Sequence, residues 1–184
     1  MCSRNRNKLR ELSALGLELD LLDADDYPPE GEESYVDNAR AKAVHGRAVG
    51  PAEAAMLGED SGLEVVALGG APGVRSARYG AEGGEAIARL LDELRGTEDR
   101  RARYVCELVL LRPGGEELRG SGVLKGRIAR EARGSEGFSY DPVFLPAGEE
   151  ATVAELGNAW KAENSHRARA AADLRGSEER RVGK

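Results

Sequence analysis

Apolar residues recur along the chain at two spacings, which predict where its helices and strands lie. Leucines three positions apart predict a helix over residues 7–15, and apolar residues on one face predict another over residues 84–95. The almost unbroken apolar run at residues 102–111 predicts a buried strand. These three segments give the chain helices and strands that each have an apolar surface to bury.

Shorter patterns complete this picture. Ser34 and Asp37 match a capping box, which predicts a helix that runs to about residue 48. Leucine alternates with acidic residues over residues 17–22, which predicts an edge strand. Two short apolar runs enclose a polar turn at residues 59–62. Further elements are expected as a strand at 117–131 and helices at 151–156 and 161–174. Helices that alternate with strands are typical of an α/β domain.

Composition and charge exclude several classes of protein. The 184 residues include 27 Lys and Arg and 33 Asp and Glu, for a net charge of −6, with 40% hydrophobic residues. No apolar stretch is long enough to span a membrane, so a membrane partner is not expected. An acidic chain is a poor general binder of nucleic acid, although an anionic small molecule remains a suitable ligand. Cys2 and Cys106 cannot form a disulfide framework, and we expect a cytoplasmic protein.

Three polar segments in the first third of the chain could carry chemistry. Residues 3–8 place hydroxyl, amide and ammonium groups at the start of a helix, which suits phosphate or forms a plain N-cap. The acidic loop at residues 30–33, with Asp37, Asn38 and Lys42 after it, suits a hard cation or is simply solvated. Glu59 and Asp60 could hold a metal ion or orient a water molecule, or could form an ordinary turn.

Two more segments lie in the second half of the chain. Residues 134–142 hold Phe138 and Tyr140, in a chain with 4% aromatic residues. An aromatic side chain in a glycine-rich loop could stack on a base, or could anchor the loop by packing. Residues 161–167 gather three side-chain donors near a predicted helix start, which could bind a ligand or form a solvated basic helix end.

The order of these segments is more specific than any one of them. The series resembles the inosine/xanthosine triphosphate pyrophosphatase family over about residues 2–174. The motifs that carry this resemblance are Ser3-x-Asn5-x-x-Lys8, Ser34-Tyr35-Val36-Asp37-Asn38-Ala39 with Lys42, Glu59-Asp60-Ser61-Gly62-Leu63, residues 69–79, Gly137-Phe138-Ser139-Tyr140-Asp141-Pro142, and Lys161-x-x-x-Ser165-His166-Arg167.

The resemblance implies a fold and an activity. The expected fold is α/β, with an elongated mixed sheet, flanking helices and two lobes around a central nucleotide-binding cleft. The expected activity is Mg²⁺-dependent hydrolysis of ITP, dITP and XTP to the monophosphate and pyrophosphate, by a homodimer. This reaction clears deaminated purines from the nucleotide pool.

The resemblance also implies roles for particular residues. Asp60 would be the catalytic carboxylate and a Mg²⁺ ligand, with Glu30 as the second ligand, or Glu32 or Glu33 in its place. The remaining residues would bind the substrate: Ser3, Asn5 and Lys8 the triphosphate, Ser61 the substrate more generally, and Phe138, Ser139, Tyr140, Asp141, Lys161, His166 and Arg167 the base. A donor such as Arg167 or His166 aimed at the 6-oxygen would accept hypoxanthine and disfavour adenine.

The sequence departs from the family pattern at four positions and at both ends. Arg4, Glu136 and Ser139 stand where glycine is usual, and Glu59 stands where bacterial members have Asp. These changes support an alternative, a non-catalytic nucleotide-binding module on the same fold. A third reading, a binder of single-stranded nucleic acid, conflicts with the acidic charge. We expect one domain over residues 1–175 that lacks the family's first strand, and a non-native tail over residues 176–184.

Overall fold

The computed structural model has the mixed α/β architecture that the sequence predicts. It describes residues 1–184 except 23, 25, 33, 81–83, 183 and 184. Within those residues the strands form a five-stranded sheet of order β2-β1-β3-β4-β5, in which β2 pairs antiparallel with β1 and β5 pairs antiparallel with β4. The strands are β1 (Met56–Val65), β2 (Pro72–Gly73), β3 (Arg101–Leu111), β4 (Glu117–Ile128) and β5 (Phe144–Pro146). The α-helices are α1 (Arg6–Ala14), α2 (Tyr35–Val49), α3 (Glu85–Glu93), α4 (Val153–Asn164) and α5 (His166–Val182), and the 3-10 helices are η1 (Val66–Leu68), η2 (Ser76–Arg78) and η3 (Asp141–Val143).

The chain divides into two compact units, each assembled from separate stretches of sequence. Unit 1 comprises residues 1–61, 106–122 and 166–184, and unit 2 comprises residues 62–105 and 123–165. The boundaries in the sequence fall within β1, β3 and β4 and between α4 and α5. Each unit has a hydrophobic core of its own.

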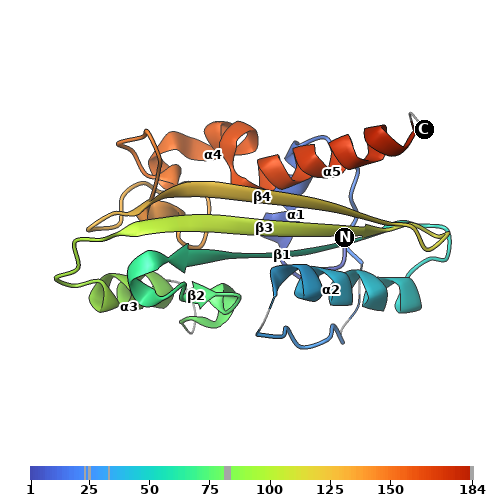
Figure 1. Ribbon diagram of the computed structural model, residues 1–184, viewed down its shortest axis with the longest axis horizontal. Helices are drawn as coiled ribbons and strands as arrows, with labels where there is room; N and C mark the ends of the chain where they lie inside the picture. Colours follow the sequence, from blue (N-terminus) through green and yellow to red (C-terminus); the bar gives the residue numbers. More distant parts are fainter. Residues whose placement is uncertain (23, 25, 33, 81–83, 183–184) are drawn as a thin grey trace. The chain divides into compact units, whose positions relative to one another are not determined.

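Unit 1 packs helices on both faces of its strand segments, with α5 on one side and α2 on the other (Figure 1). Glycines make this close approach possible. A Cβ atom at Gly58 of β1 would lie 3.0 Å from the backbone nitrogen of Ala43 in α2, and one at Gly122 of β4 would lie 2.5 Å from the backbone nitrogen of Ala170 in α5. The core between these layers includes Leu12, Leu57, Cys106, Leu108, Ala171 and Leu174.

Unit 2 buries a larger aromatic core. The rings of Tyr104 on β3 and Phe144 on β5 lie 4.4 Å apart between their centroids. Leu90 of α3 and Val153 of α4 pack into the same cluster. The guanidinium of Arg100 donates to the backbone carbonyls of Leu94, Ile128 and Ala129 at 2.8–3.0 Å, which satisfies three carbonyl acceptors at once.

Several sequence predictions of local structure are wrong, and each error has a physical cause. Residues 59–62 are not a turn, because they continue β1, with Glu59, Asp60 and Gly62 buried and Ser61 partly buried. The alternating segment 17–22 is not a strand. Leu22 donates to the Met1 carbonyl at 2.9 Å and accepts the Tyr27 hydroxyl at 3.0 Å, and the Met1 ammonium donates to the Asp20 carbonyl at 2.6 Å, so these bonds do not form the repeated pairing of a ladder.

The remaining differences concern where elements end. β4 ends at Ile128, before residue 131. The expected end of a helix at residue 156 is confirmed, because Gly157 has non-helical angles (φ +86°, ψ 173°) that interrupt α4. A further break lies at Ser165, within the expected helix over residues 161–174, and α5 continues to Val182, so residues 176–182 are helical. The structure also has a complete capping box at the start of α4, which the sequence patterns above did not predict. In it, the side chains of Thr152 and Glu155 each accept the other residue's backbone N–H.

Other predictions of local structure are confirmed. The Ser34 hydroxyl caps α2 by accepting the N–H of Asp37 at 3.3 Å. The helices over residues 7–15 and 84–95 and the strand over residues 102–111 correspond to α1, α3 and β3. Among the described residues, none of the helices combines the length and apolar character that crossing a bilayer requires.

The close packing of β1 on α2 makes Gly58 sensitive to substitution. Gly58→Ala is expected to lower the free energy of unfolding by about 3 kcal/mol or more, because the new methyl group meets the α2 backbone, which cannot move away as a side chain could. Urea denaturation would measure this loss. Gly114→Ala is the matched control, since no heavy atom lies within 4 Å of a Cβ there. Equal stability of the two variants would contradict this account.

Candidate active site

The centre of β1 carries two adjacent acidic residues, and both are buried. Glu59 is 1% exposed and Asp60 is 3% exposed. Successive side chains of a strand point to opposite faces, so Asp60 projects away from Glu59 and Ser61. A buried carboxylate needs a cation or several hydrogen bonds, and each of these two meets its partners from different helices.

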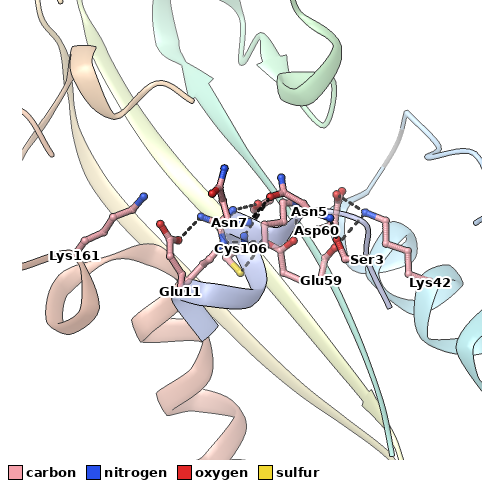
Figure 2. Close-up of polar contacts among 12 residues, drawn as sticks. Ser3, Asn5, Asn7, Glu11, Lys42, Glu59, Asp60, Cys106 and Lys161 are labelled. Atoms are coloured by element: carbon pink, nitrogen blue, oxygen red, sulfur yellow. Dashed lines mark hydrogen bonds and ion pairs between the residues drawn. The ribbon is translucent and has the colours of Figure 1, made fainter. Parts of the chain in front are cut away.

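Asp60 is held by two residues of α2. The side-chain amide of Asn38 donates to Oδ2 of Asp60 at 3.0 Å, and the ammonium of Lys42 lies 3.1 Å from Oδ1. Asn38 and Lys42 are four residues apart, so they share one face of the helix. Figure 2 shows Lys42 reaching from its helix to the carboxylate of Asp60.

Lys42 also joins Asp60 to the acidic loop. Its ammonium lies 2.6 Å from Oε1 of Glu30 and donates to the backbone carbonyl of Glu59 at 3.1 Å. The two carboxylates that the sequence offers as metal ligands, Glu30 and Asp60, therefore share one ammonium group. Glu32 is exposed, and Glu33 lies outside the described residues.

The electrostatics of this group follow from burial. Burial raises the pKa of Asp60, and the neighbouring Lys42, Lys8 and Asn38 only partly oppose it, so this pKa lies above its ordinary value. Burial lowers the pKa of Lys42, but Asp60 and Glu30 outweigh it, so that pKa is raised. Asp60 is thus a stronger base than an exposed aspartate, beside a firmly charged ammonium.

These residues fit a hard divalent cation in the donors that they supply. Such a cation takes one or two protein carboxylates and completes its shell with water and phosphate oxygens. Across the part of the chain that the structure describes, no cluster of three or more His, Cys, Asp or Glu side chains is arranged to hold a metal ion. The pair Glu30 and Asp60 therefore suits a cation that takes its remaining ligands from water or from substrate oxygens, rather than an all-protein metal site.

On the other face of β1, Glu59 is the centre of an ion-pair network. Lys8 of α1 lies 2.6 Å from Oε2 of Glu59, and Nε of Arg167 in α5 donates to Oε1 at 3.2 Å. Arg167 also donates to the Ser61 hydroxyl at 2.7 Å and to Glu11 at 2.9 Å. The thiol of Cys106 lies 3.7 Å from Oε1. Figure 2 shows Glu59, Glu11 and Cys106 around this network.

This network shows roles that the sequence analysis missed. Burial alone would raise the pKa of Glu59, but Lys8 and Arg167 together outweigh it and hold the pKa well below its ordinary value. The sequence offers Glu59 as a metal or water ligand or as part of a turn, whereas in the structure Glu59 is the counter-ion of both Lys8 and Arg167. Glu11 lies three residues after Lys8, and that spacing could have placed it on the same face of α1.

Ser3 and Asn5 act as a helix cap in this structure. The Asn5 side chain accepts the backbone N–H groups of Asn7 at 3.0 Å and Lys8 at 3.2 Å. The Ser3 hydroxyl accepts the N–H of Asn5 at 3.0 Å. Residues 3–8 therefore contain an N-cap, and a phosphate role for them stays a prediction. His166, 3% exposed, begins α5 in unit 1, next to Arg167.

Unit 2 has its own buried carboxylate, Asp141, which organises the loop that carries Phe138. Oδ2 of Asp141 accepts the N–H of Phe138 at 2.8 Å and pairs with the Lys161 ammonium, while Tyr104 donates to Oδ1 at 3.3 Å. The same ammonium lies 4.4 Å from the centroid of the Phe138 ring. Asp141 and Lys161 are 2% and 4% exposed.

The backbone of this loop is unusual at Ser139. Its φ is +59°, the left-handed region that favours glycine, at one of the positions where the sequence departs from the family pattern. Tyr140 is buried beside it, where its hydroxyl donates to the carbonyl of Ser76 at 2.9 Å, and burial raises its pKa.

The predicted site residues form two groups, one in each unit. Those in unit 1 are Ser3, Asn5, Lys8, Glu30, Asp60, Ser61, His166 and Arg167, and those in unit 2 are Phe138, Ser139, Tyr140, Asp141 and Lys161.

Comparison with known proteins finds one family and relatives with the same name. The model of the Ham1 family matches residues 1–177. A dITP/XTP pyrophosphatase of Bdellovibrio bacteriovorus is 45% identical over 147 residues, which cover 77% of this chain and 73% of the relative. A dITP/XTP pyrophosphatase of Gloeobacter violaceus is 40% identical over 178 residues, 95% of this chain and 90% of the relative.

Solved structures agree with these sequence matches. The Ham1 protein of Staphylococcus aureus has a TM-score of 0.83 and 32% identity, over 98% of this chain and 97% of that one. The nucleoside-triphosphatase/dITP/XTP pyrophosphatase of Mycobacterium abscessus has a TM-score of 0.71 and 41% identity, over 94% of each chain.

The Glu59 network makes stability depend on pH. The pKa of Glu59 is lower in the folded chain than its ordinary 4.5, so its ionised form stabilises the fold above about pH 4.5 and less below it. Glu59→Gln is expected to lower the free energy of unfolding by about 3–5 kcal/mol at pH 7, because Lys8 and Arg167 lose their counter-ion. At pH 3 the loss is expected to be clearly smaller. Urea denaturation at both pH values checks this.

Glu64→Gln is the matched control on the same strand. Glu64 pairs with the half-exposed Arg103, and such pairs contribute less than about 1 kcal/mol. If Glu59→Gln lowers the free energy of unfolding by the same amount at pH 7 and pH 3, Glu59 stabilises the fold by packing alone.

Proposed function

The chain belongs to the Ham1 family, and from that premise we propose that it is a pyrophosphatase of deaminated purine nucleoside triphosphates. It hydrolyses ITP, dITP and XTP to the monophosphate and pyrophosphate, which clears these nucleotides from the pool. The names of its relatives, dITP/XTP pyrophosphatases, support this substrate class. The observation that carries the proposal in this chain is the pair of carboxylates, Glu30 and Asp60, that share the Lys42 ammonium.

Asp60 is the proposed general base. The oxygen of a water molecule forms a bond with the α-phosphorus, the bond to the bridging oxygen breaks, and pyrophosphate leaves. Asp60 orients that water and takes its proton, and the raised pKa of this buried carboxylate makes it a better acceptor. Asn38 and Lys42 fix the carboxylate from the α2 side, so its orientation does not depend on the substrate.

Positive charge near the phosphates stabilises the leaving group. Lys8 and Lys42 are the ammonium groups beside Glu59 and Asp60, and Lys8 is also the triphosphate contact that the motif order suggests. Such preorganised charges act where negative charge develops in the transition state. Ser3 and Asn5 shape the turn before α1, because their side-chain oxygens accept the backbone N–H groups of Asn5, Asn7 and Lys8. Their proposed phosphate contacts are therefore their own side-chain donors, the Ser3 hydroxyl and the Asn5 Nδ2 group.

A nucleoside triphosphate as substrate implies a divalent metal cofactor, and we propose that it is Mg²⁺. Asp60 and Glu30 would hold it, with phosphate oxygens as further ligands. When bound, the ion supplies charge neutralisation for the phosphates.

Recognition of the base rests on the motif order. In this proposal Phe138 stacks on the base, and donors among Lys161, His166 and Arg167 meet the 6-oxygen of hypoxanthine or xanthine. Adenine would place an amino group against these donors, at a cost of about 1–3 kcal/mol for each unpaired buried group. The backbone around Ser139, Tyr140 and Asp141 holds the Phe138 ring in place. A homodimer in the cytoplasm is part of the same proposal, and the resemblance to the family supports it.

A substrate panel tests the activity directly. Pyrophosphate release from dITP, ITP and XTP is expected to require Mg²⁺ and to exceed release from ATP by tens- to hundreds-fold. Ion chromatography separates pyrophosphate from orthophosphate in the same assay. Equal rates with ATP, or orthophosphate alone, would contradict the proposal. Thermal stabilisation by ITP without any product would favour the non-catalytic binding module.

The role of Asp60 has its own test. Asp60→Asn is expected to lower turnover by about 10²–10⁴-fold, because the amide cannot accept the proton from water. Nucleotide binding, measured by isothermal titration calorimetry, is expected to change much less. Asp99→Asn is the control, since Asp99 pairs with Arg101 at 2.7 Å in unit 2. An active Asp60→Asn variant would assign the base to another residue.

A further inference from the structure

One face of α2 holds the acidic loop in place through three polar side chains. Asn38, Lys42 and His45 are spaced by four and three residues, so they form a stripe along a single side of the helix. Residues 26–31 of the loop meet this stripe in reverse order: Gly31 at Asn38, Glu30 at Lys42, and Asp26 at His45. The ring of Tyr27 lies 5.3 Å from that of His45.

The loop depends on these side chains because its own backbone has little to offer. Pro28 and Pro29 have no N–H groups, so this part of the loop cannot donate to a ladder or a helix. The outer end of the stripe holds it weakly, since Asp26 is 82% exposed at its contact of 3.3 Å with His45. The inner end, at Asn38, is buried and contacts Asp60 and the residue next to Glu30.

Asn38 uses its whole carboxamide at this inner end. Its Oδ1 accepts the N–H of Gly31 at 2.7 Å, and its Nδ2 donates to the Gly31 carbonyl at 3.2 Å and to Oδ2 of Asp60 at 3.0 Å. Asn38 is 5% exposed. The side chain therefore pairs with Gly31 as a neighbouring backbone would, and at the same time it holds Asp60.

These contacts close a ring. Asp60 connects to Asn38, Asn38 to Gly31, Gly31 by its peptide bond to Glu30, Glu30 to Lys42, and Lys42 back to Asp60. Lys42 links the two carboxylates through hydrogen bonds from one ammonium, whose donors rotate at the end of a flexible side chain. Asn38 links them by three directional hydrogen bonds, so it sets the position of the residue next to Glu30 relative to Asp60.

We propose that Asn38 is a positioning residue, which holds Glu30 and Asp60 at the separation that a divalent cation needs. The inference rests on the proposed function, because that function assigns these two carboxylates to the metal. Asparagine suits the task because it combines an acceptor for the Gly31 N–H with donors for two oxygens. Aspartate at this position would place a second negative charge beside Asp60 and would lose both donors.

The test compares Asn38→Ala with Arg40→Ala, a control on the same helix. Arg40 pairs with Glu117 and Asp37, outside the stripe, so its loss destabilises α2 without touching the ring. Binding of Mn²⁺ alone is measured by electron paramagnetic resonance, without nucleotide. The concentration of Mn²⁺ for half-saturation is expected to rise roughly 10-fold or more in Asn38→Ala and to stay unchanged in Arg40→Ala.

Turnover of dITP provides the second readout. In Asn38→Ala, kcat/KM is expected to fall at limiting Mg²⁺ and to recover in large part at saturating Mg²⁺, whereas a merely structural defect would lower activity at every Mg²⁺ concentration. Gly31→Pro attacks the same contact from the exposed loop, because it removes the N–H that Asn38 accepts. It is expected to raise the half-saturating Mn²⁺ concentration in the same way, even if Asn38→Ala does not fold.

Three outcomes would overturn the inference. They are an unchanged Mn²⁺ affinity in Gly31→Pro and in any folded Asn38→Ala, an equal loss of affinity in Arg40→Ala, and a wild-type chain that binds no Mn²⁺. Failure of the proposed function is distinguishable, because it appears as wild-type chain that does not release pyrophosphate from dITP. A wild-type chain that hydrolyses dITP, with variants whose Mn²⁺ affinity is unchanged, contradicts only the role of Asn38.

Discussion

Two adjacent carboxylates, buried on opposite faces of one strand, require the helices of unit 1 to supply compensating cations to each face. Glu59 and Asp60 are each almost fully buried on β1, and a buried carboxylate without a partner would be very costly. Because the strand sends them to opposite faces, each carboxylate forms its ion pairs with cations from different helices. Lys8 from α1 and Arg167 from α5 approach Glu59, and Lys42 from α2 approaches Asp60.

This arrangement is better explained by the proposed function than by stability. A buried ion pair often contributes no more to folding than well-packed apolar residues would. It does keep charged groups fixed in a region of low dielectric, where, in the proposed function, they would act strongly on the reacting phosphate. Asp141 in unit 2 follows the same rule, since Lys161, Tyr104 and the Phe138 backbone compensate it and thereby shape the loop that carries the Phe138 ring.

Sequence patterns predicted the fold well where a single periodicity dominated. The helices α1 and α3 and the strand β3 have apolar residues at clear spacings, and the structure contains them. The polar pattern of residues 59–62 predicts a turn, whereas the structure continues β1 there, because the partners that compensate its charges are distant in sequence. Arg167 lies 108 residues from Glu59 in the sequence. No local pattern therefore reveals that Arg167 compensates the charge of Glu59 and so allows a carboxylate at a buried position of β1.

By itself, the sequence determined the fold class and the family, because apolar spacing and the order of short motifs are local properties of the chain. Its motif series also included Asp60 and Lys42, and the resemblance to the family implied Glu30 as a second metal ligand beside Asp60. Only the tertiary structure decided which face of β1 each acidic side chain takes, and that Glu59 and Glu11 engage Arg167. It also decided that Asn38 joins the acidic loop to Asp60. Those choices depend on contacts between segments far apart in sequence, where burial and charge compensation act together.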